Sequence, residues 1–262
     1  GAGKASALMA KEIESILGKH ITAGHVVVKY GHSCELKHIK VTEAGHPIPD
    51  NNSVIAADEI LEIAIKASEK DIFICLLSGG GSSVMTDCPD GVTLAEIITL
   101  NNLLLKSGAD IKDINTVRKH LSKVKGGKLA KAVYPATLIG LILSDVVGDS
   151  IDVIASGPTV HDFTTYQAIL TKYNINREVP LSIINYLKKG AGGLYSAPPD
   201  SNSEYFKNIY NFIVGSNKIA LKAAKNKSDE MGLHSIIVTD ELEGDSVKAA
   251  DYMIETALKI QK

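Results

Sequence analysis

A glycine-rich turn flanked by serines is the strongest chemical signal in this sequence of 262 residues, and it directly follows the apolar run of residues 71–77. The turn consists of Ser78, Gly79, Gly80, Gly81, Ser82 and Ser83. Glycines let a backbone turn tightly and approach a ligand, and the N–H groups of such a turn can converge on an anion. A plain strand-to-helix turn is the simpler alternative. Three glycines between serines favour anion binding, with the serine hydroxyls as further donors.

A second glycine turn opens the chain and places a lysine, Lys4, at the start of an expected helix. The turn is not a complete Walker A motif, because Ala5 follows Lys4 where Ser or Thr is needed. It is not a complete dinucleotide fingerprint either, because Ser6 stands in place of the third glycine. A lysine is electrostatically unfavourable at a helix N-terminus. We therefore predict that Lys4 serves an anionic ligand, with a solvated lysine as the alternative.

A basic cluster occupies residues 110–131, which carry seven Lys or Arg residues against two Asp in a chain of net charge −2. Arg118 and Lys125 are seven residues apart and would share one face of a helix. Gly126 and Gly127 then break the helix and let the backbone approach a ligand. We predict that this cluster binds phosphate or carboxylate, although a solvated basic face is the usual alternative.

Asp145 stands just beyond the apolar run of residues 136–143, at the end of an expected buried strand. Ligands of parallel sheets bind beyond the carboxyl ends of the strands. Asp145 is therefore predicted to orient a substrate hydroxyl, to accept its proton or to hold Mg²⁺. Asp149 is a second candidate for Mg²⁺, with a cap or turn role as the alternative. His46, in the rigid turn of residues 43–47, is a candidate for facing the same ligand.

Apolar, β-branched runs alternate with stretches of helical periodicity along the chain. Strands are expected over residues 25–29, 37–42, 71–77, 136–143, 211–214 and 235–239. Helices are expected over residues 5–17, 53–68, 94–106, 114–124, 164–173, 180–189, 217–231 and 246–259, with a loop over 190–200. This order predicts an α/β fold with a mostly parallel, Rossmann-like sheet and helices on both faces.

The composition of the chain argues against several classes of protein. A net charge of −2 provides no global basic field for nucleic acid or an anionic membrane. Three cysteines without CxxC spacing argue against a disulfide framework or a zinc ribbon. No stretch approaches the roughly 18 apolar residues of a membrane helix. We expect a cytoplasmic protein with small-molecule ligands and with neither a nucleic-acid nor a membrane partner. The oligomeric state stays open, and a homodimer is compatible with the sequence.

Together these motifs resemble the glycerate 2-kinase family whose members carry a C-terminal MOFRL domain. In chain order, the resemblance is carried by residues 1–5, 28–32, 43–47, 77–83, 117–122, 125–127, 143–146 and 154–159. It implies a two-domain kinase in which residues 1–262 are the larger N-terminal α/β domain, without the strand expected before Gly1 and without the MOFRL domain. It also implies ATP-dependent, Mg²⁺-assisted phosphorylation of glycerate to 2-phosphoglycerate.

The resemblance implies roles for single residues. Lys4 and Asp145 match the family's site lysine and aspartate, and Arg118 and Lys125 are further matches. A planar guanidinium suits a carboxylate, so we expect Arg118 to pair with glycerate, but which basic residue binds carboxylate and which binds phosphate stays open. The glycine-rich turn would hold phosphate oxygens, and Mg²⁺ would lie near Asp145 or Asp149. Two alternatives remain: an NAD(P)-dependent hydroxypyruvate reductase, which the incomplete dinucleotide fingerprint opposes, and a non-catalytic anion-binding domain.

Overall fold

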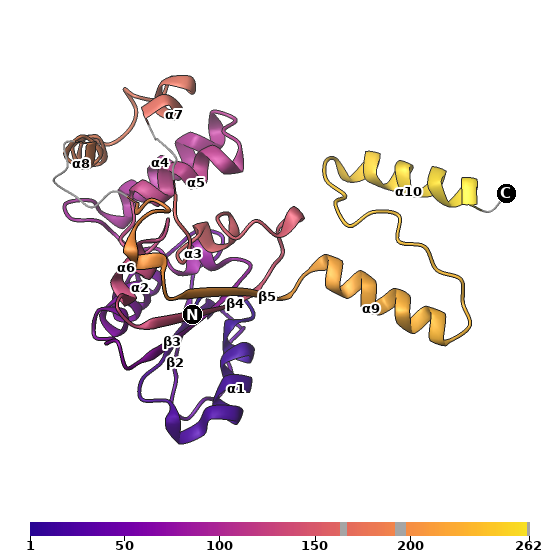
Figure 1. The fold of residues 1–262 in the computed structure, drawn as a ribbon. Coiled ribbons are helices and arrows are strands. Elements are labelled where there is room, and N and C mark those ends of the chain that lie inside the picture. The colour runs from indigo at the N-terminus through magenta and orange to yellow at the C-terminus, as the bar shows by residue number, and fades with distance from the viewer. Residues whose placement is uncertain (163–166, 192–197, 261–262) are drawn as a thin grey trace.

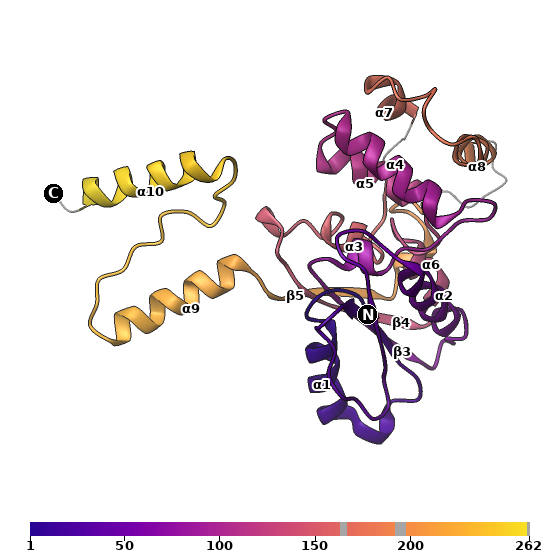
Figure 2. The same ribbon diagram turned by 180° about the vertical axis from the view of Figure 1, so that it is seen from behind.

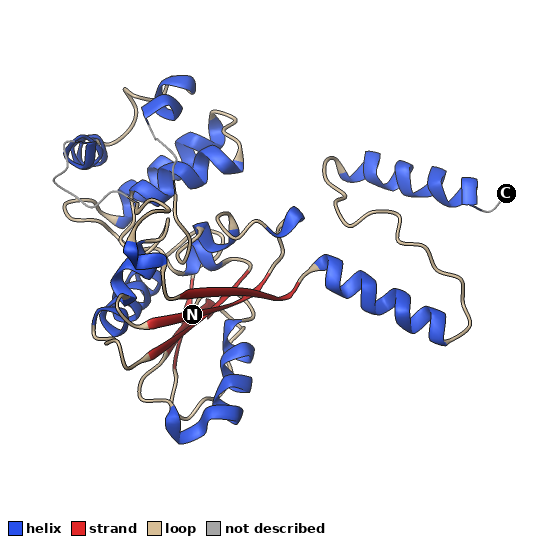
Figure 3. Cartoon of the chain, viewed as in Figure 1, coloured by secondary structure: helices blue, strands red, loops and turns tan. Residues whose placement is uncertain are grey.

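A parallel β-sheet forms the centre of the protein (red in Figure 3). The computed structural model describes residues 1–162, 167–191 and 198–260. The strands are β1 (His25–Lys29), β2 (Lys40–Ala44), β3 (Ile72–Ser78), β4 (Thr137–Leu143) and β5 (Ile209–Gly215). β1 pairs with β2, and β4 pairs with both β3 and β5, each time in parallel. Ala2 bridges Val27 of β1 and Leu77 of β3 and so joins the two parts of the sheet. The expected α/β fold with a mostly parallel sheet is confirmed.

Helices cover both faces of this sheet, as Figures 1 and 2 show. The helices nearest to it are α1 (Ser6–Leu17), α2 (Asn51–Ile65), α3 (Gly81–Val84) and α6 (Lys128–Val133). Val26 and Val28 pack in the cluster of α1, whereas Val27 between them packs in the cluster of α2 and α6. This alternation follows the two-residue period of a strand. Asp50 caps α2 by accepting a hydrogen bond from Ser53 N, which explains why the helix begins before residue 53.

Four further helices form a separate layer above the sheet, which we call the helical cap (top of Figure 1). They are α4 (Leu94–Lys106), α5 (Ile111–His120), α7 (Gln167–Lys172) and α8 (Leu181–Ala191). Their apolar side chains form a core of their own around Leu104, Val117, Leu170 and Ile183. The cap comes from the two connections that flank β4 in the chain. The sequence predicted these helices, but not that they pack against one another instead of the sheet.

The C-terminal part of the chain extends away from the sheet in Figures 1 and 2. It contains α9 (Asn217–Glu230) and α10 (Ser246–Ile260), neither of which has a buried residue. The strand expected over residues 235–239 is wrong, because these residues have no strand structure. β-branched residues favour an extended backbone, but a strand also needs a neighbouring edge to pair with. Here the segment returns beside α9 and does not reach the exposed edge of β5.

The remaining boundaries differ from expectation by a few residues. The helix expected over residues 114–124 begins three residues earlier, because Asp110 caps α5 by accepting from Asp113 N. The part of the helix over 164–173 that precedes Gln167 lies outside the described residues, as does most of the loop over 190–200. Among the described helices, none combines the length and the apolar character that a membrane crossing requires.

Candidate active site

Three side chains from distant parts of the chain meet at the glycine-rich turn. Lys4 precedes α1, His46 precedes α2, and Asp145 follows β4. A Cβ placed on Gly80 would lie 3.0 Å from His46 Nε2 and 3.2 Å from Lys4 Cε. A Cβ placed on Gly79 would overlap the Asp145 carboxylate. The structure therefore brings Lys4, His46 and Asp145 together against the bare backbone of Gly79 and Gly80.

The turn that carries Lys4 is fixed directly to the glycine-rich turn. Lys4 N donates to Gly79 O at 3.0 Å, and Ala5 N donates to Ser78 Oγ at 3.0 Å. Ser78 is 1% exposed, so its hydroxyl serves this internal contact. Gly3 has a φ of +130°, and a Cβ there would overlap the backbone of Ser78. The predicted ligand-binding serine Ser78 therefore lies where it anchors Lys4.

The electrostatics around His46 favour a neutral imidazole. Burial lowers the pKa of His46 below its ordinary value, and the positive charges of Lys4 and Lys29 lower it further, while Asp145 opposes them. A neutral imidazole has one N–H donor and one acceptor nitrogen. His46 can therefore hydrogen-bond a ligand next to Lys4 without adding a second positive charge.

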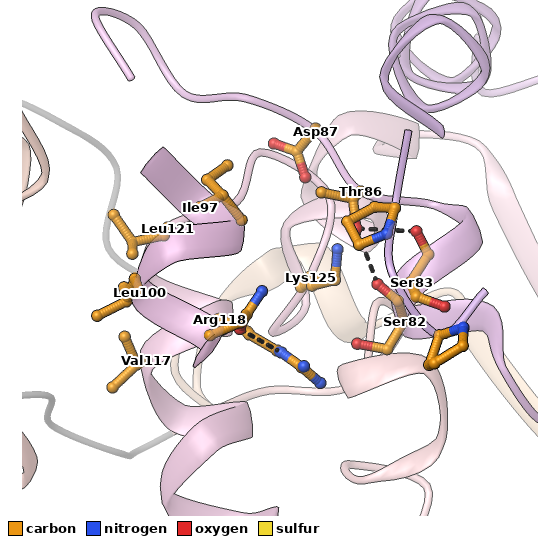
Figure 4. A pocket seen from close by; sticks show the side chains of 13 residues that line it. Ser82, Ser83, Thr86, Asp87, Ile97, Leu100, Val117, Arg118, Leu121 and Lys125 are labelled. Atoms are coloured by element: carbon orange, nitrogen blue, oxygen red, sulfur yellow. Dashed lines mark hydrogen bonds between the residues drawn. The ribbon is translucent and has the colours of Figure 1, made fainter. Parts of the chain in front are cut away.

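The other end of the glycine-rich turn borders a pocket between the sheet and the helical cap (Figure 4). Ser82 and Ser83 line it from the sheet side, and Arg118 reaches into it from α5. Arg118 Nε donates to Asn101 Oδ1 of α4 at 3.0 Å, which holds the guanidinium in the pocket. Lys125 also lines the pocket, but from the loop after α5. The expectation that Arg118 and Lys125 share one helix face is therefore wrong, because α5 ends at His120. The predicted pair of basic residues nevertheless meets the predicted pair of serines in one place.

Lys125 is the most deeply buried cation of this pocket, with an exposed fraction of 3%. Its Nζ donates to Met85 O at 2.6 Å. Burial lowers the pKa of Lys125 to about 8, with Asp87 opposing and Arg118 reinforcing the shift. An ammonium group has three donors, so the one given to Met85 leaves capacity for a ligand. A bound anion would favour the charged form of Lys125 and would regain part of the cost of burying it.

Asp87 also lines the pocket and holds in place the basic loop, residues 121–127 between α5 and α6. Its carboxylate is 1% exposed and accepts hydrogen bonds from Ser122 Oγ and Lys123 N. Its charge raises the pKa values of both Lys125 and Lys128, against the larger effect of burial. Asp87 is therefore a negative charge that favours the charged form of both buried lysines, and Asp162 adds to its effect at Lys128.

Asp145 and Asp149 line a common cavity of about 270 Å³ at the start of α9, which also includes Asn217, Asp240 and Glu241. Within residues 1–162, 167–191 and 198–260, no group of three or more His, Cys, Asp or Glu side chains is arranged to hold a metal ion. Mg²⁺ is commonly held by one or two carboxylates together with substrate phosphates. The carboxylates of Asp145 and Asp149, two of the four at this cavity, fit that kind of binding.

Several residues of these sites were not identified from the sequence. Lys29 ends β1 at the same edge as Asp145, and the rule for strand ends would have found it. Thr86 and Asn101 line the pocket of Arg118, but neither belongs to a recognisable motif. Their place in the pocket depends on how the helical cap packs over the glycine-rich turn, which no local pattern in the sequence specifies.

Curated proteins with similar sequences carry the names of glycerate kinases. A glycerate 2-kinase from Pyrococcus horikoshii is 46% identical over 250 residues, which are 94% of this chain and 56% of that protein. A D-glycerate 2-kinase from Thermotoga maritima is 39% identical over 257 residues, which are 96% of this chain and 58% of that protein. The chain thus spans about half the length of the curated relatives it matches.

A crystal structure of a glycerate kinase from Thermotoga maritima has the same fold, with a TM-score of 0.80 at 40% identity. The match covers 90% of this chain and 55% of that one. A family model described as a domain of unknown function, DUF4147, matches residues 1–188, which hold Lys4, the glycine-rich turn, the basic cluster and Asp145. On this match, the chain belongs to the DUF4147 family.

Proposed function

We propose that the protein transfers a phosphoryl group from ATP to glycerate and forms 2-phosphoglycerate. The observation that carries the proposal is the meeting of Lys4, His46 and Asp145 at one end of the glycine-rich turn, with Arg118 and Lys125 at its other end. The names of the curated relatives support the same activity. A cytoplasmic location and a homodimer stay predictions from the sequence.

In the proposed mechanism, the pocket of Arg118 and Lys125 binds the acceptor. Arg118 pairs with the glycerate carboxylate, because a planar guanidinium suits a two-point contact with carboxylate oxygens. Lys125 adds a second positive charge from the floor of the pocket. Holding the carboxylate at one end of the glycine-rich turn directs the hydroxyl at C2 toward the other end.

The groups at Gly79 and Gly80 act on the transferred phosphoryl group. Its loose transition state needs positioning and neutralised charge more than covalent chemistry. Lys4 stabilises negative charge on the phosphoryl oxygens, and backbone N–H groups of the turn bind them. Asp145 orients the C2 hydroxyl and accepts its proton late in the transfer. Neutral His46 hydrogen-bonds the phosphoryl oxygens without placing a second positive charge beside Lys4.

Asp145 and Asp149 are the residues that would hold Mg²⁺, since both line the cavity beside the glycine-rich turn. The ion would neutralise charge on the nucleotide phosphates. The assignment depends on the donor set, because carboxylate oxygens are the ligands that Mg²⁺ prefers.

A reductase is the second candidate, because a relative from Agrobacterium vitis at 40% identity carries hydroxypyruvate reductase as a provisional name. One experiment separates the two. The full-length protein is given ATP, Mg²⁺ and D-glycerate in one assay, and hydroxypyruvate with NADH or NADPH in another. The proposal predicts ADP formation that depends on D-glycerate. Oxidation of the nicotinamide without ADP formation would establish the reductase, and anion binding without either reaction would leave a non-catalytic domain.

A further inference from the structure

A buried chain of hydrogen bonds connects the pocket of Arg118 to a strained turn behind it. The Oγ atoms of Ser82 and Ser156 are 2.8 Å apart, and Ser156 Oγ donates to Asn115 Oδ1 at 3.2 Å. Ser156 is 0% exposed and Asn115 is 5% exposed, so water does not compete for the bond between them. Ser82, in contrast, lines the pocket. The chain therefore runs from the pocket surface into the interior.

The backbone at Ser156 is held in a conformation that L-residues avoid. Ala155, Ser156 and Gly157 have φ values of 51°, 61° and 59°, three left-handed residues in a row. Such residues normally occur singly and are mostly glycine, and non-glycine strain of this kind concentrates at functional sites. Gly126 N and Gly127 N donate to the carbonyls of Ser156 and Gly157 at 3.0 and 2.8 Å. The strained turn is thus fastened to the basic loop that carries Lys125.

The directions of these hydrogen bonds follow from the number of protons available. A serine hydroxyl has one proton, and that of Ser156 is given to Asn115. Ser82 must then donate its own proton to Ser156. Toward the pocket, Ser82 therefore presents only the lone pairs of its oxygen.

The neighbouring hydroxyl groups of the pocket also donate their protons to groups of the protein. Ser83 Oγ donates to Gly80 O at 3.3 Å, and Thr86 Oγ1 donates to Ser83 O at 2.9 Å. The pocket thus has cationic donors, Arg118 and Lys125, and hydroxyl oxygens that accept (Figure 4). A molecule with an anionic group and a hydroxyl donor satisfies both sets, whereas a dicarboxylate satisfies only the cations.

We propose that Ser156, oriented by Asn115 and by its left-handed backbone, is a positioning residue that makes Ser82 a hydrogen-bond acceptor for a hydroxyl of the acceptor substrate. The inference rests on the proposed function, and the hydroxyl concerned is the one at C3 of glycerate, which is not phosphorylated. Ser82 thereby selects hydroxy acids that carry a second hydroxyl. An acid without that group leaves the Ser82 oxygen buried and without a donor.

The test compares D-glycerate with D-lactate, which has the C2 hydroxyl but lacks the C3 hydroxyl. In the full-length wild-type protein, kcat/KM for D-glycerate should exceed that for D-lactate by roughly 5-fold to 150-fold, the range for one unsatisfied buried acceptor. Ser82→Ala should remove this preference. Ser156→Gly should lower it by roughly 2-fold to 10-fold through a higher KM for D-glycerate, with kcat and the constants for D-lactate kept.

The variants are chosen so that a loss of stability is not mistaken for a loss of specificity. Ser156→Gly relieves a left-handed residue but also leaves the buried Asn115 Oδ1 without its donor, so the melting temperature of the variant is measured beside its kinetics. Asn174→Gly is the matched control, because Asn174 is also left-handed, with a φ of 53°, but is exposed in the loop after α7. It should leave the preference unchanged. Asn115→Leu, which removes the acceptor at similar volume, should act like Ser156→Gly and serves if that variant does not fold.

The outcomes separate this inference from the proposed function. If the wild-type protein phosphorylates neither acid, the proposed function fails and the inference fails with it. If the wild-type protein phosphorylates D-glycerate but Ser156→Gly and Asn115→Leu keep the wild-type preference, or reduce activity on both acids equally, the inference alone is overturned. A selective rise in KM for D-glycerate in either variant supports it.

Discussion

The carboxylate of Asp145 lies so close to the backbone of Gly79 that no Cβ fits between them. Gly79 does not have a positive φ, so the reason for glycine here is the approach of the carboxylate and not the shape of the turn. At Gly80 the two reasons combine, because φ is +85° and His46 and Lys4 lie within 3.2 Å of a Cβ position. The glycines thus let charged side chains reach the backbone that is proposed to bind phosphate.

Gly79→Ala should therefore impair catalysis much more than folding. The atoms that a Cβ would meet belong to the end of the Asp145 side chain, which can rotate away. The free energy of unfolding should change by less than about 2 kcal/mol, whereas kcat should fall about 10²-fold or more because the displaced carboxylate no longer meets the substrate hydroxyl. Steady-state kinetics and urea denaturation of the same preparation provide both values.

Gly190→Ala is the matched control for this substitution. Gly190 lies in α8, and a Cβ there would have no neighbour within 4 Å. The change should leave kcat unaltered and stabilise the helix by up to about 1 kcal/mol. Equal activity of Gly79→Ala and Gly190→Ala would show that the position of Asp145 at Gly79 does not matter for the reaction.

Lys4→Met should lower kcat by about 10²-fold to 10⁴-fold, since it removes a positive charge from the proposed position of the transferred phosphoryl group. The methionine keeps an unbranched apolar side chain beside Gly80, so packing is preserved. Lys11→Met, at an exposed position of α1, is the control and should retain full activity. An unchanged kcat/KM in Lys4→Met would rule out the role of Lys4 in catalysis.

The acceptor pocket should lose affinity as pH rises, because the pKa of Lys125 is lowered to about 8. Below that pH the ammonium is charged and attracts the carboxylate, and above it the charge is lost. The pH profile of kcat/KM, which reports the free enzyme, should therefore decline above about pH 8. Lys125→Met should lower kcat/KM about tenfold to a hundredfold at pH 7 and should abolish this decline. If kcat/KM of the wild-type protein stayed level up to about pH 9.5, the assignment of Lys125 to the acceptor pocket would be contradicted.

Asp87→Asn should destabilise the protein by about 3 to 5 kcal/mol, the range for removing one partner of a buried charged group. The amide keeps an acceptor for Ser122 but removes the negative charge that acts on both Lys125 and Lys128, while Lys128 retains the charge of Asp162. Asp90→Asn, at an exposed position three residues away, should change stability by no more than about 0.5 kcal/mol. Chemical denaturation of both variants measures the difference, and equal stability of the two would show that Asp87 does not support the lysines.

The strands of the sheet could be predicted because each central strand corresponds to a short apolar run in the sequence. Residues 71–77 and 136–143 are apolar runs of strand length, and they form β3 and β4 with ends shifted by one residue. The helical cap was not predictable, because an amphipathic helix has the same periodicity whether it packs on a sheet or on another helix. The expected strand over residues 235–239 failed for a related reason, since composition does not reveal whether a sheet edge is within reach.

The placement of Asp145 followed from the rule for strand ends, which needs only the order of the elements. Lys4 was predicted for another reason, because a lysine is electrostatically unfavourable at a helix N-terminus. The chain from Ser82 through Ser156 to Asn115 could not be predicted, because its hydrogen bonds join residues 74 and 41 positions apart. Nor does any residue type at Ala155 and Ser156 signal a left-handed backbone. Those features depend on how the loops pack, which the sequence records only through the complete fold.

The proposed reaction is tested most directly by the identity of its product. The full-length protein is incubated with ATP, Mg²⁺ and D-glycerate, and the phosphorylated product is identified by ³¹P NMR. The expected product is 2-phosphoglycerate, formed at the expense of ATP and formed about 10²-fold to 10⁴-fold more slowly when Lys4→Met replaces the wild-type protein. Formation of 3-phosphoglycerate, or no phosphorylated glycerate at all, would contradict the proposed reaction.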